Sequence, residues 1–92
     1  MSILVRFTPE NMTSEMYDEG TRRLEEAGLW PPEGMLAHVC FGSDPNLRVS
    51  EVWNSQEQME AFGERLMPIL TQVGVELSQQ PEILPVKNVV TP

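Results

Sequence analysis

The sequence has few basic residues, with six lysines and arginines against fourteen aspartates and glutamates and a net charge of −8. Nucleic acids and anionic membranes are both bound through clustered basic side chains, so both partners are disfavoured. The single cysteine, Cys40, cannot form an internal disulfide, which fits a reducing cytoplasm. No apolar run approaches the roughly 20 residues of a membrane span, and no signal-peptide pattern is visible. We therefore expect a cytoplasmic protein that binds neither nucleic acid nor membrane.

Motifs that would identify a cofactor or a metal are also missing. The chain has no glycine-rich phosphate loop, no CxxC pair and no Rossmann fingerprint. His38 and Cys40 have the same parity on one predicted strand and point the same way. A structural zinc site needs four ligands, however, and a catalytic site usually needs three protein ligands. The sequence therefore predicts no bound cofactor and no metal site.

Alternating apolar residues bounded by turn residues predict strands in four places, namely 3–7, 35–41, 47–53 and about 83–90. Pro85 in the last run predicts an edge strand or a bulge. Helical patterns follow the first and the third runs. The order strand–helix–strand–strand–helix–strand in one domain, residues 1–92, predicts an α+β, ferredoxin-like fold. In that fold two helices cover one face of a four-stranded antiparallel sheet.

Capping residues locate the two helices. Thr13 is the expected N-cap of the first helix, which ends at a glycine. Ser55 and Gln58 form a capping box, in which each side chain is expected to satisfy a backbone N–H of the other residue. The second helix then covers 56–73. Pro68 lies inside it and is expected to kink the helix or split it in two.

Both faces of the predicted sheet carry apolar side chains. Alternation along the second strand separates two sets, Ala37, Val39 and Phe41 against Leu36, His38 and Cys40. The first set is more apolar and is expected to pack under the helices. The other face is still apolar enough to need a cover. A second copy of the chain in a closed two-fold contact supplies one, so we expect a homodimer.

The junction of the third strand and the second helix reads Glu51-Val52-Trp53-Asn54-Ser55, followed by Glu57 and Phe62. With the order and length of the elements, it resembles the dimeric α+β barrel superfamily, which includes the antibiotic-biosynthesis monooxygenase-like proteins. The resemblance implies two sheets facing each other across a dimer and a cavity in each protomer. It implies activities that range from cofactor-independent oxidation of quinol-like aromatics to haem degradation. Haem degradation is disfavoured, because the first strand has no asparagine and the second helix no histidine.

His38, the only histidine, is the candidate catalytic residue. If Ala37, Val39 and Phe41 pack under the helices, His38 faces the other way, into the barrel of the dimer. An imidazole in a cavity can act as a general base near neutral pH or hydrogen-bond a phenol. The alternative is a partly buried histidine held by one structural hydrogen bond.

Four further residues are candidates for ligand binding: Arg6, Glu51, Trp53 and Phe62. Arg6 has the opposite parity to Val5 and Phe7, so it too is expected to point into the barrel and to hold an anionic oxygen. Glu51 and Trp53 share one face of the third strand. In the alternative interpretation, which we prefer for these two, Arg6 and Glu51 form an ion pair across strands and Trp53 belongs to the core.

The sequence thus predicts a barrel protein that binds a small apolar or aromatic metabolite. A cofactor-independent, monooxygenase-like reaction with His38 as the base fits the same residues. The alternative is a non-catalytic ligand-binding or assembly module, in which side chains fill the cavity.

Overall fold

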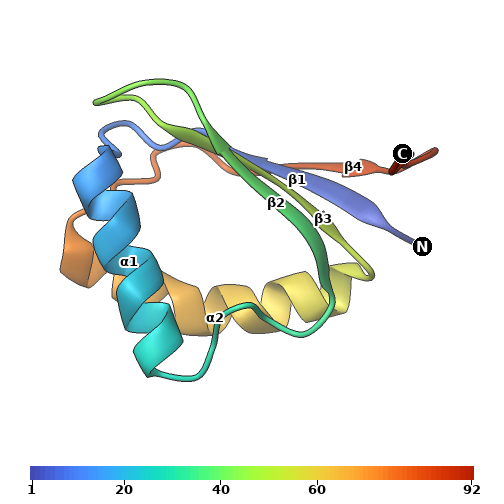
Figure 1. Ribbon diagram of the computed structural model, residues 1–92, viewed down its shortest axis with the longest axis horizontal. Coiled ribbons are helices and arrows are strands. Elements are labelled where there is room, and N and C mark those ends of the chain that lie inside the picture. Colours follow the sequence, from blue (N-terminus) through green and yellow to red (C-terminus); the bar gives the residue numbers. More distant parts are fainter.

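The computed structural model describes residues 1–92. Six elements follow one another: β1 (Ile3–Phe7), α1 (Ser14–Glu26), β2 (Met35–Phe41), β3 (Arg48–Trp53), α2 (Gln56–Val73) and β4 (Glu82–Pro85). The strands form one antiparallel sheet in the order β2-β3-β1-β4. Both helices lie on the same side of this sheet (Figure 1). The predicted ferredoxin-like fold is confirmed.

Both helices begin at the predicted N-caps, and α2 ends at a glycine as expected, whereas the C-cap of α1 is Ala27, one residue before the predicted Gly28. The Thr13 hydroxyl accepts a hydrogen bond from the backbone N–H of Met16, and the Ser55 hydroxyl accepts one from that of Gln58. Gly74 ends α2 with a φ of 95°, which L side chains rarely adopt. Only half of the capping box forms. The Gln58 side chain meets the Ser55 hydroxyl, at 3.2 Å, instead of the Ser55 backbone N–H.

Pro68 does not split α2, which is one helix from Gln56 to Val73. Proline removes a single backbone hydrogen bond, and the helix is packed on both sides of it. Phe62 precedes Pro68 in one apolar cluster, and Leu70 follows it against a second cluster. Packing of both halves on the same sheet outweighs the lost bond, so the predicted split is wrong, whereas a kink stays a prediction.

The orientation of β2 differs from the prediction. His38 is the antiparallel partner of Glu51, and such partners share a face of the sheet. Glu51 is buried beneath the helices at 6% exposure, so His38 faces the helices as well. Val39 is 54% exposed on the outer face. The expectation that Ala37, Val39 and Phe41 pack under the helices is therefore wrong.

A register shift between Met35 and Ala37 adds to this difference. It leaves Leu36 outside the regular ladder and 61% exposed, while Met35 packs against the core. Simple alternation fails across such a bulge, because one extra residue reverses the side on which later side chains lie.

Two apolar clusters fill the layer between the sheet and the helices. The larger contains Ile3, Val5, Leu24, Trp53, Met59 and Phe62. The smaller contains Met12, Leu47, Val49 and Val75. Residues of both clusters line one cavity, so the core is not filled continuously.

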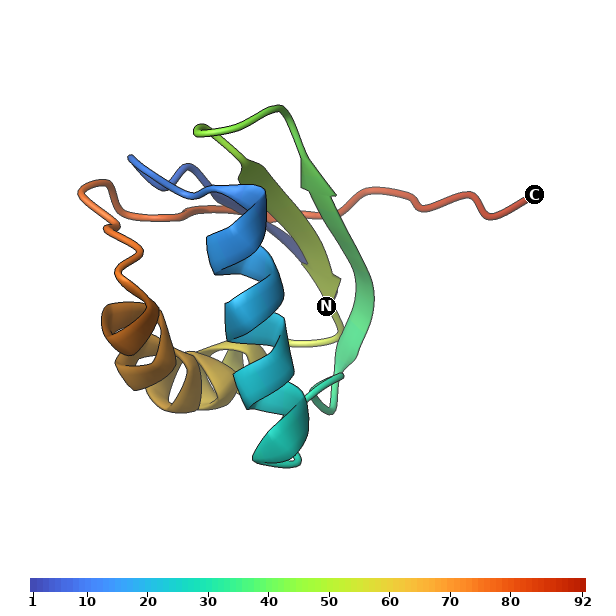
Figure 2. The same ribbon diagram turned by 60° about the vertical axis from the view of Figure 1, so that its left-hand side comes forward.

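The last strand is an edge strand, as Pro85 predicts, but it ends at Pro85 instead of near residue 90. The Val86 backbone N–H donates to the Ser2 carbonyl oxygen at 3.0 Å. Figure 2 shows the following residues leading away from the rest of the fold. Neither helix is long and apolar enough to cross a bilayer.

Candidate functional site

Four side chains under the sheet form a continuous chain of hydrogen bonds. The Tyr17 hydroxyl lies 2.7 Å from Nε2 of His38. Nδ1 of His38 lies 2.7 Å from Oε2 of Glu51. Nε1 of Trp53 donates to the other carboxylate oxygen, Oε1, at 3.0 Å. The chain therefore runs from helix α1 through the two neighbouring strands β2 and β3.

Regular secondary structure fixes each member of this chain. His38 and Glu51 are paired positions on adjacent strands, and Trp53 lies two residues beyond Glu51 on the same face. Tyr17 lies in the first turns of α1, where its backbone N–H donates to the carbonyl oxygen of Thr13. The polar side chains thus sit on rigid elements, which holds their geometry.

The hydrogen bonds assign the proton positions. An indole N–H can only donate, so Oε1 of Glu51 accepts from Trp53. In the neutral form of His38, the carboxylate oxygen Oε2 accepts the Nδ1–H, which leaves Nε2 as the acceptor that faces the Tyr17 hydroxyl. Glu51 is the only charged residue that is buried, and no buried side-chain nitrogen or oxygen lacks a partner. Glu51 therefore orients His38 so that Nε2 faces Tyr17.

Burial acts on the two weak acids near His38. It raises the pKa of the Tyr17 phenol, and the charges of Cys40 and Glu51 raise it further against an opposing hydrogen bond from Thr21. Burial and the charge of Asp18 also raise the pKa of the Cys40 thiol. Tyr17 is therefore a neutral O–H donor at neutral pH, and Cys40 lacks the thiolate that a nucleophile needs.

A cavity of about 80 Å³, measured by where the centre of a water molecule fits, adjoins the hydrogen-bond chain. Most of its 17 lining residues are hydrophobic. Its polar members are Tyr17, Thr21, His38 and Glu51, and no lysine or arginine lines it. The Trp30 ring meets the His38 ring edge-on with centroids 4.9 Å apart, and the Tyr17 ring stacks on it at 5.9 Å. Polar side chains of this apolar space thus gather around His38.

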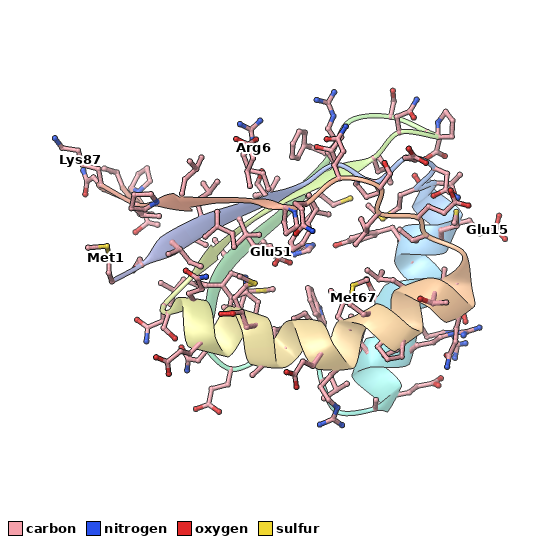
Figure 3. The ribbon with its side chains drawn as sticks, turned by 180° about the vertical axis from the view of Figure 1, so that it is seen from behind. Met1, Arg6, Glu15, Glu51, Met67 and Lys87 are labelled. Carbon is pink, nitrogen blue, oxygen red and sulfur yellow. The ribbon has the colours of Figure 1, made fainter.

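The predicted site residues divide between the two faces of the sheet. His38, Glu51 and Phe62 line the cavity, and Trp53 lies fully buried behind Glu51. Arg6 does not join them. Figure 3 shows Arg6 on the side of the sheet away from the helices, and Glu51 on the helix side.

Arg6 pairs with Ser50 across the strands, one position from the Val5–Glu51 pair, so alternation sends it outward. Its nearest carboxylate is that of Glu82, at 3.9 Å. Arg6 thus faces away from the helices, as expected, whereas the alternative, an ion pair with Glu51, is wrong because the two side chains lie on opposite faces. Its expected role of holding an anionic oxygen in the barrel of a dimer stays a prediction. The expectation that His38 faces away from the helices is wrong for the same reason of strand pairing.

Sequence reasoning missed Tyr17 and Trp30. Tyr17 lies beside Met16 on the apolar stripe that continues through Gly20 and Leu24, at helical spacing, and it is the only tyrosine. Trp30 opens the stiff Trp-Pro-Pro connection that follows α1. The signal in each case was a lone aromatic at the edge of a core pattern, which does not by itself identify a partner.

No protein-family model and no curated protein matches the chain. Several solved structures are similar to the chain. The protein YjcS is 12% identical, with 95% of this chain and 100% of that chain covered at a TM-score of 0.67. A proposed antibiotic biosynthesis monooxygenase from Chloroflexus aurantiacus J-10-fl is 15% identical, with 98% of each chain covered at a TM-score of 0.62. SnoaB, a cofactor-independent oxygenase from Streptomyces nogalater, is 14% identical, with 99% of this chain and 96% of that chain covered at a TM-score of 0.60.

The chain has the fold of the antibiotic biosynthesis monooxygenase-like proteins. The coverage is nearly complete in both directions, so the similarity extends over every element of the sheet and both helices. Sequence identities of 12–15% show the fold alone. The chemistry has to be argued from this chain's own residues.

Proposed function

We propose that the cavity between the sheet and the helices binds a small, neutral aromatic molecule with a phenolic hydroxyl, and that His38 accepts the proton of that hydroxyl. The observation that carries this proposal is the Glu51–His38 pair, which aims Nε2 at the one polar place in an apolar cavity. The absence of lysine and arginine from the lining disfavours carboxylate and phosphate ligands, since nothing would neutralise them.

The reaction we propose is oxidation of the bound ring by dioxygen without a bound cofactor. His38 takes the hydroxyl proton, which raises the electron density at the ring carbon opposite the oxygen. Dioxygen adds there, one oxygen atom stays as a new carbonyl group, and the other leaves as water with the two hydrogens that the ring loses. SnoaB, which shares this fold, is a cofactor-independent oxygenase, and that description supports a reaction of this class.

The test uses 1-naphthol, whose product would be 1,4-naphthoquinone. Calorimetry measures binding, an oxygen electrode measures dioxygen uptake, and naphthalene is the control that lacks the hydroxyl. His38→Gln keeps a hydrogen-bond acceptor but removes the base, so binding should be partly kept and turnover lost. Equal turnover in the wild type and in His38→Gln would overturn the role of the base.

The alternative is a non-catalytic ligand-binding or assembly module in which side chains fill most of the cavity, and the small size of the cavity favours it. An engineered cavity of about 150 Å³ is the size that holds benzene, whereas this one measures about 80 Å³. Ligand binding to His38 without dioxygen uptake would support this second function.

We also propose that two copies pair through the outer face of the sheet. Several large apolar side chains of β2 and β4 are exposed on this face, namely Leu36, Val39, Phe41 and Leu84. The helices cover only the other face, so this face has no cover within the chain. A homodimer of the barrel type would bury it, and light scattering at low micromolar concentration measures the mass directly.

A further inference from the structure

We propose that Tyr17 occupies the position of the ligand's hydroxyl, and that a phenolic ligand binds by replacing Tyr17 as the donor to His38. This inference rests on the proposed function and names how the ligand is selected. It makes Tyr17 a specificity-determining residue that competes with every ligand.

The hydrogen bonds around His38 leave no free place for a ligand. Nδ1 is held by Glu51 at 2.7 Å, and Nε2 is taken by the Tyr17 hydroxyl at 2.7 Å. A neutral imidazole has one acceptor nitrogen with one lone pair. A ligand that gives its proton to His38 must therefore displace the Tyr17 hydroxyl first.

The volume of the cavity leads to the same conclusion. At about 80 Å³ it is roughly half the size that holds a benzene ring. Movement of the Tyr17 ring away from His38 would add the volume of one ring at the place where the ligand's hydroxyl has to sit. One rotation of a side chain thus provides both the space and the acceptor.

Because the ligand competes with Tyr17, its hydroxyl must donate a stronger hydrogen bond to His38 than the Tyr17 hydroxyl does. Tyr17 donates from a neutral phenol that is part of the protein, so it pays no cost of association. Its pKa is raised, which makes it a weaker donor than an ordinary phenol. Phenols and enols with more acidic hydroxyl groups can therefore replace it, whereas aliphatic alcohols, which donate less strongly, cannot.

The probe for this proposal is p-cresol, which reproduces the tyrosine side chain, and toluene is the matched probe without a hydroxyl. Tyr17→Phe keeps the ring and removes only the competing donor. One net hydrogen bond of about 1 kcal/mol corresponds to roughly fivefold in a dissociation constant. Calorimetry should therefore show p-cresol binding about fivefold more tightly to Tyr17→Phe than to the wild type. Toluene cannot replace Tyr17 as a donor to His38, so it should bind more weakly than p-cresol to both proteins.

A second pair of variants separates competition from a general change of the cavity. His38→Ala removes the acceptor for which the two phenols compete, so adding Tyr17→Phe to it should give no gain in p-cresol affinity. Tyr17→Ala empties the ring position, so p-cresol should raise the melting temperature of Tyr17→Ala more than that of the wild type. These results together would support replacement of Tyr17 by the ligand.

Other outcomes have distinct meanings. Weaker or unchanged p-cresol binding in Tyr17→Phe would overturn this inference, because Tyr17 would then assist the ligand or ignore it. If p-cresol binds the wild type and His38→Ala equally, or binds neither, the proposed function itself fails. The two failures are therefore distinguishable in one set of titrations.

Discussion

A single methyl group at Gly20 tests the cavity with little disturbance of the fold. Gly20 lies in the middle of α1, is buried and lines the cavity, and a Cβ atom built there would have no atom within 4 Å. Alanine in a helix interior is more stable than glycine by about 0.5–1 kcal/mol. Gly20→Ala should therefore stabilise the protein while the added methyl group takes up part of the cavity.

Gly63→Ala is the matched control. Gly63 lies in the middle of α2, and a Cβ atom there also has no atom within 4 Å, but Gly63 does not line the cavity. Both variants should gain about 0.5–1 kcal/mol from the helix backbone. A gain of 1 kcal/mol raises the melting temperature by about 4–8 °C in a domain of this size. The comparison is made at one protein concentration, since a dimer's stability depends on it.

Binding separates the two variants. Calorimetry with p-cresol should show a weaker affinity in Gly20→Ala, because the cavity of about 80 Å³ has no volume to spare, and an unchanged affinity in Gly63→Ala. Loss of stability in Gly20→Ala would contradict the open space beside α1. Unchanged p-cresol affinity in Gly20→Ala, with binding intact, would refute the assignment of this cavity as the ligand site.

Three further predictions concern the hydrogen-bond chain and the outer face. Glu51→Gln should lower the free energy of unfolding by about 1–3 kcal/mol in urea denaturation, since the glutamine NH2 group would face one of the two N–H donors, Trp53 or His38. A loss below about 0.5 kcal/mol, on the order of a neutral surface change, would argue against the pair. Burial raises the pKa of Tyr17, so the folded protein holds the phenol proton more tightly than the unfolded chain does. The contribution of Tyr17 to stability should be full below about pH 10 and decline as the pH rises through the raised pKa, and Tyr17→Phe should remove this decline. Phenolate absorbance that appears at an ordinary tyrosine pKa would contradict the prediction. Val39→Glu puts a charge on the 54% exposed outer-face position and should yield a folded monomer in light scattering, whereas an intact dimer would place the interface elsewhere.

The fold follows from the sequence because local signals agree with one another. The caps at Thr13 and Ser55, the glycine at 74 and the alternation in 3–7 each specify one element, and their order leaves few topologies. The orientation of β2 does not follow in the same way. Its two faces are both apolar, and the bulge after Met35 makes alternation misleading, so only the pairing of His38 with Glu51 decides the matter.

The site was predictable in its parts but not in its assembly. His38 and Glu51 are unusual residues within apolar strands, which marks them as candidates. Their meeting depends on a register between β2 and β3 that no local pattern specifies. Tyr17 reaches His38 only because α1 lies on the side of the sheet that His38 faces, which is a property of helix packing. Arg6 lies on the face that parity on β1 predicts, but His38 lies on the opposite face, so the two predicted site residues do not meet.

The most direct test of the central claim is a nuclear Overhauser measurement between p-cresol and the imidazole of His38. The chain has one histidine, so its imidazole proton signals belong to His38 alone. Binding in the cavity predicts cross-peaks from the p-cresol ring protons to the imidazole protons of His38, and to side chains of the cavity such as Phe62 and Leu24. Bound p-cresol with cross-peaks only to outer-face side chains such as Val39 would contradict it.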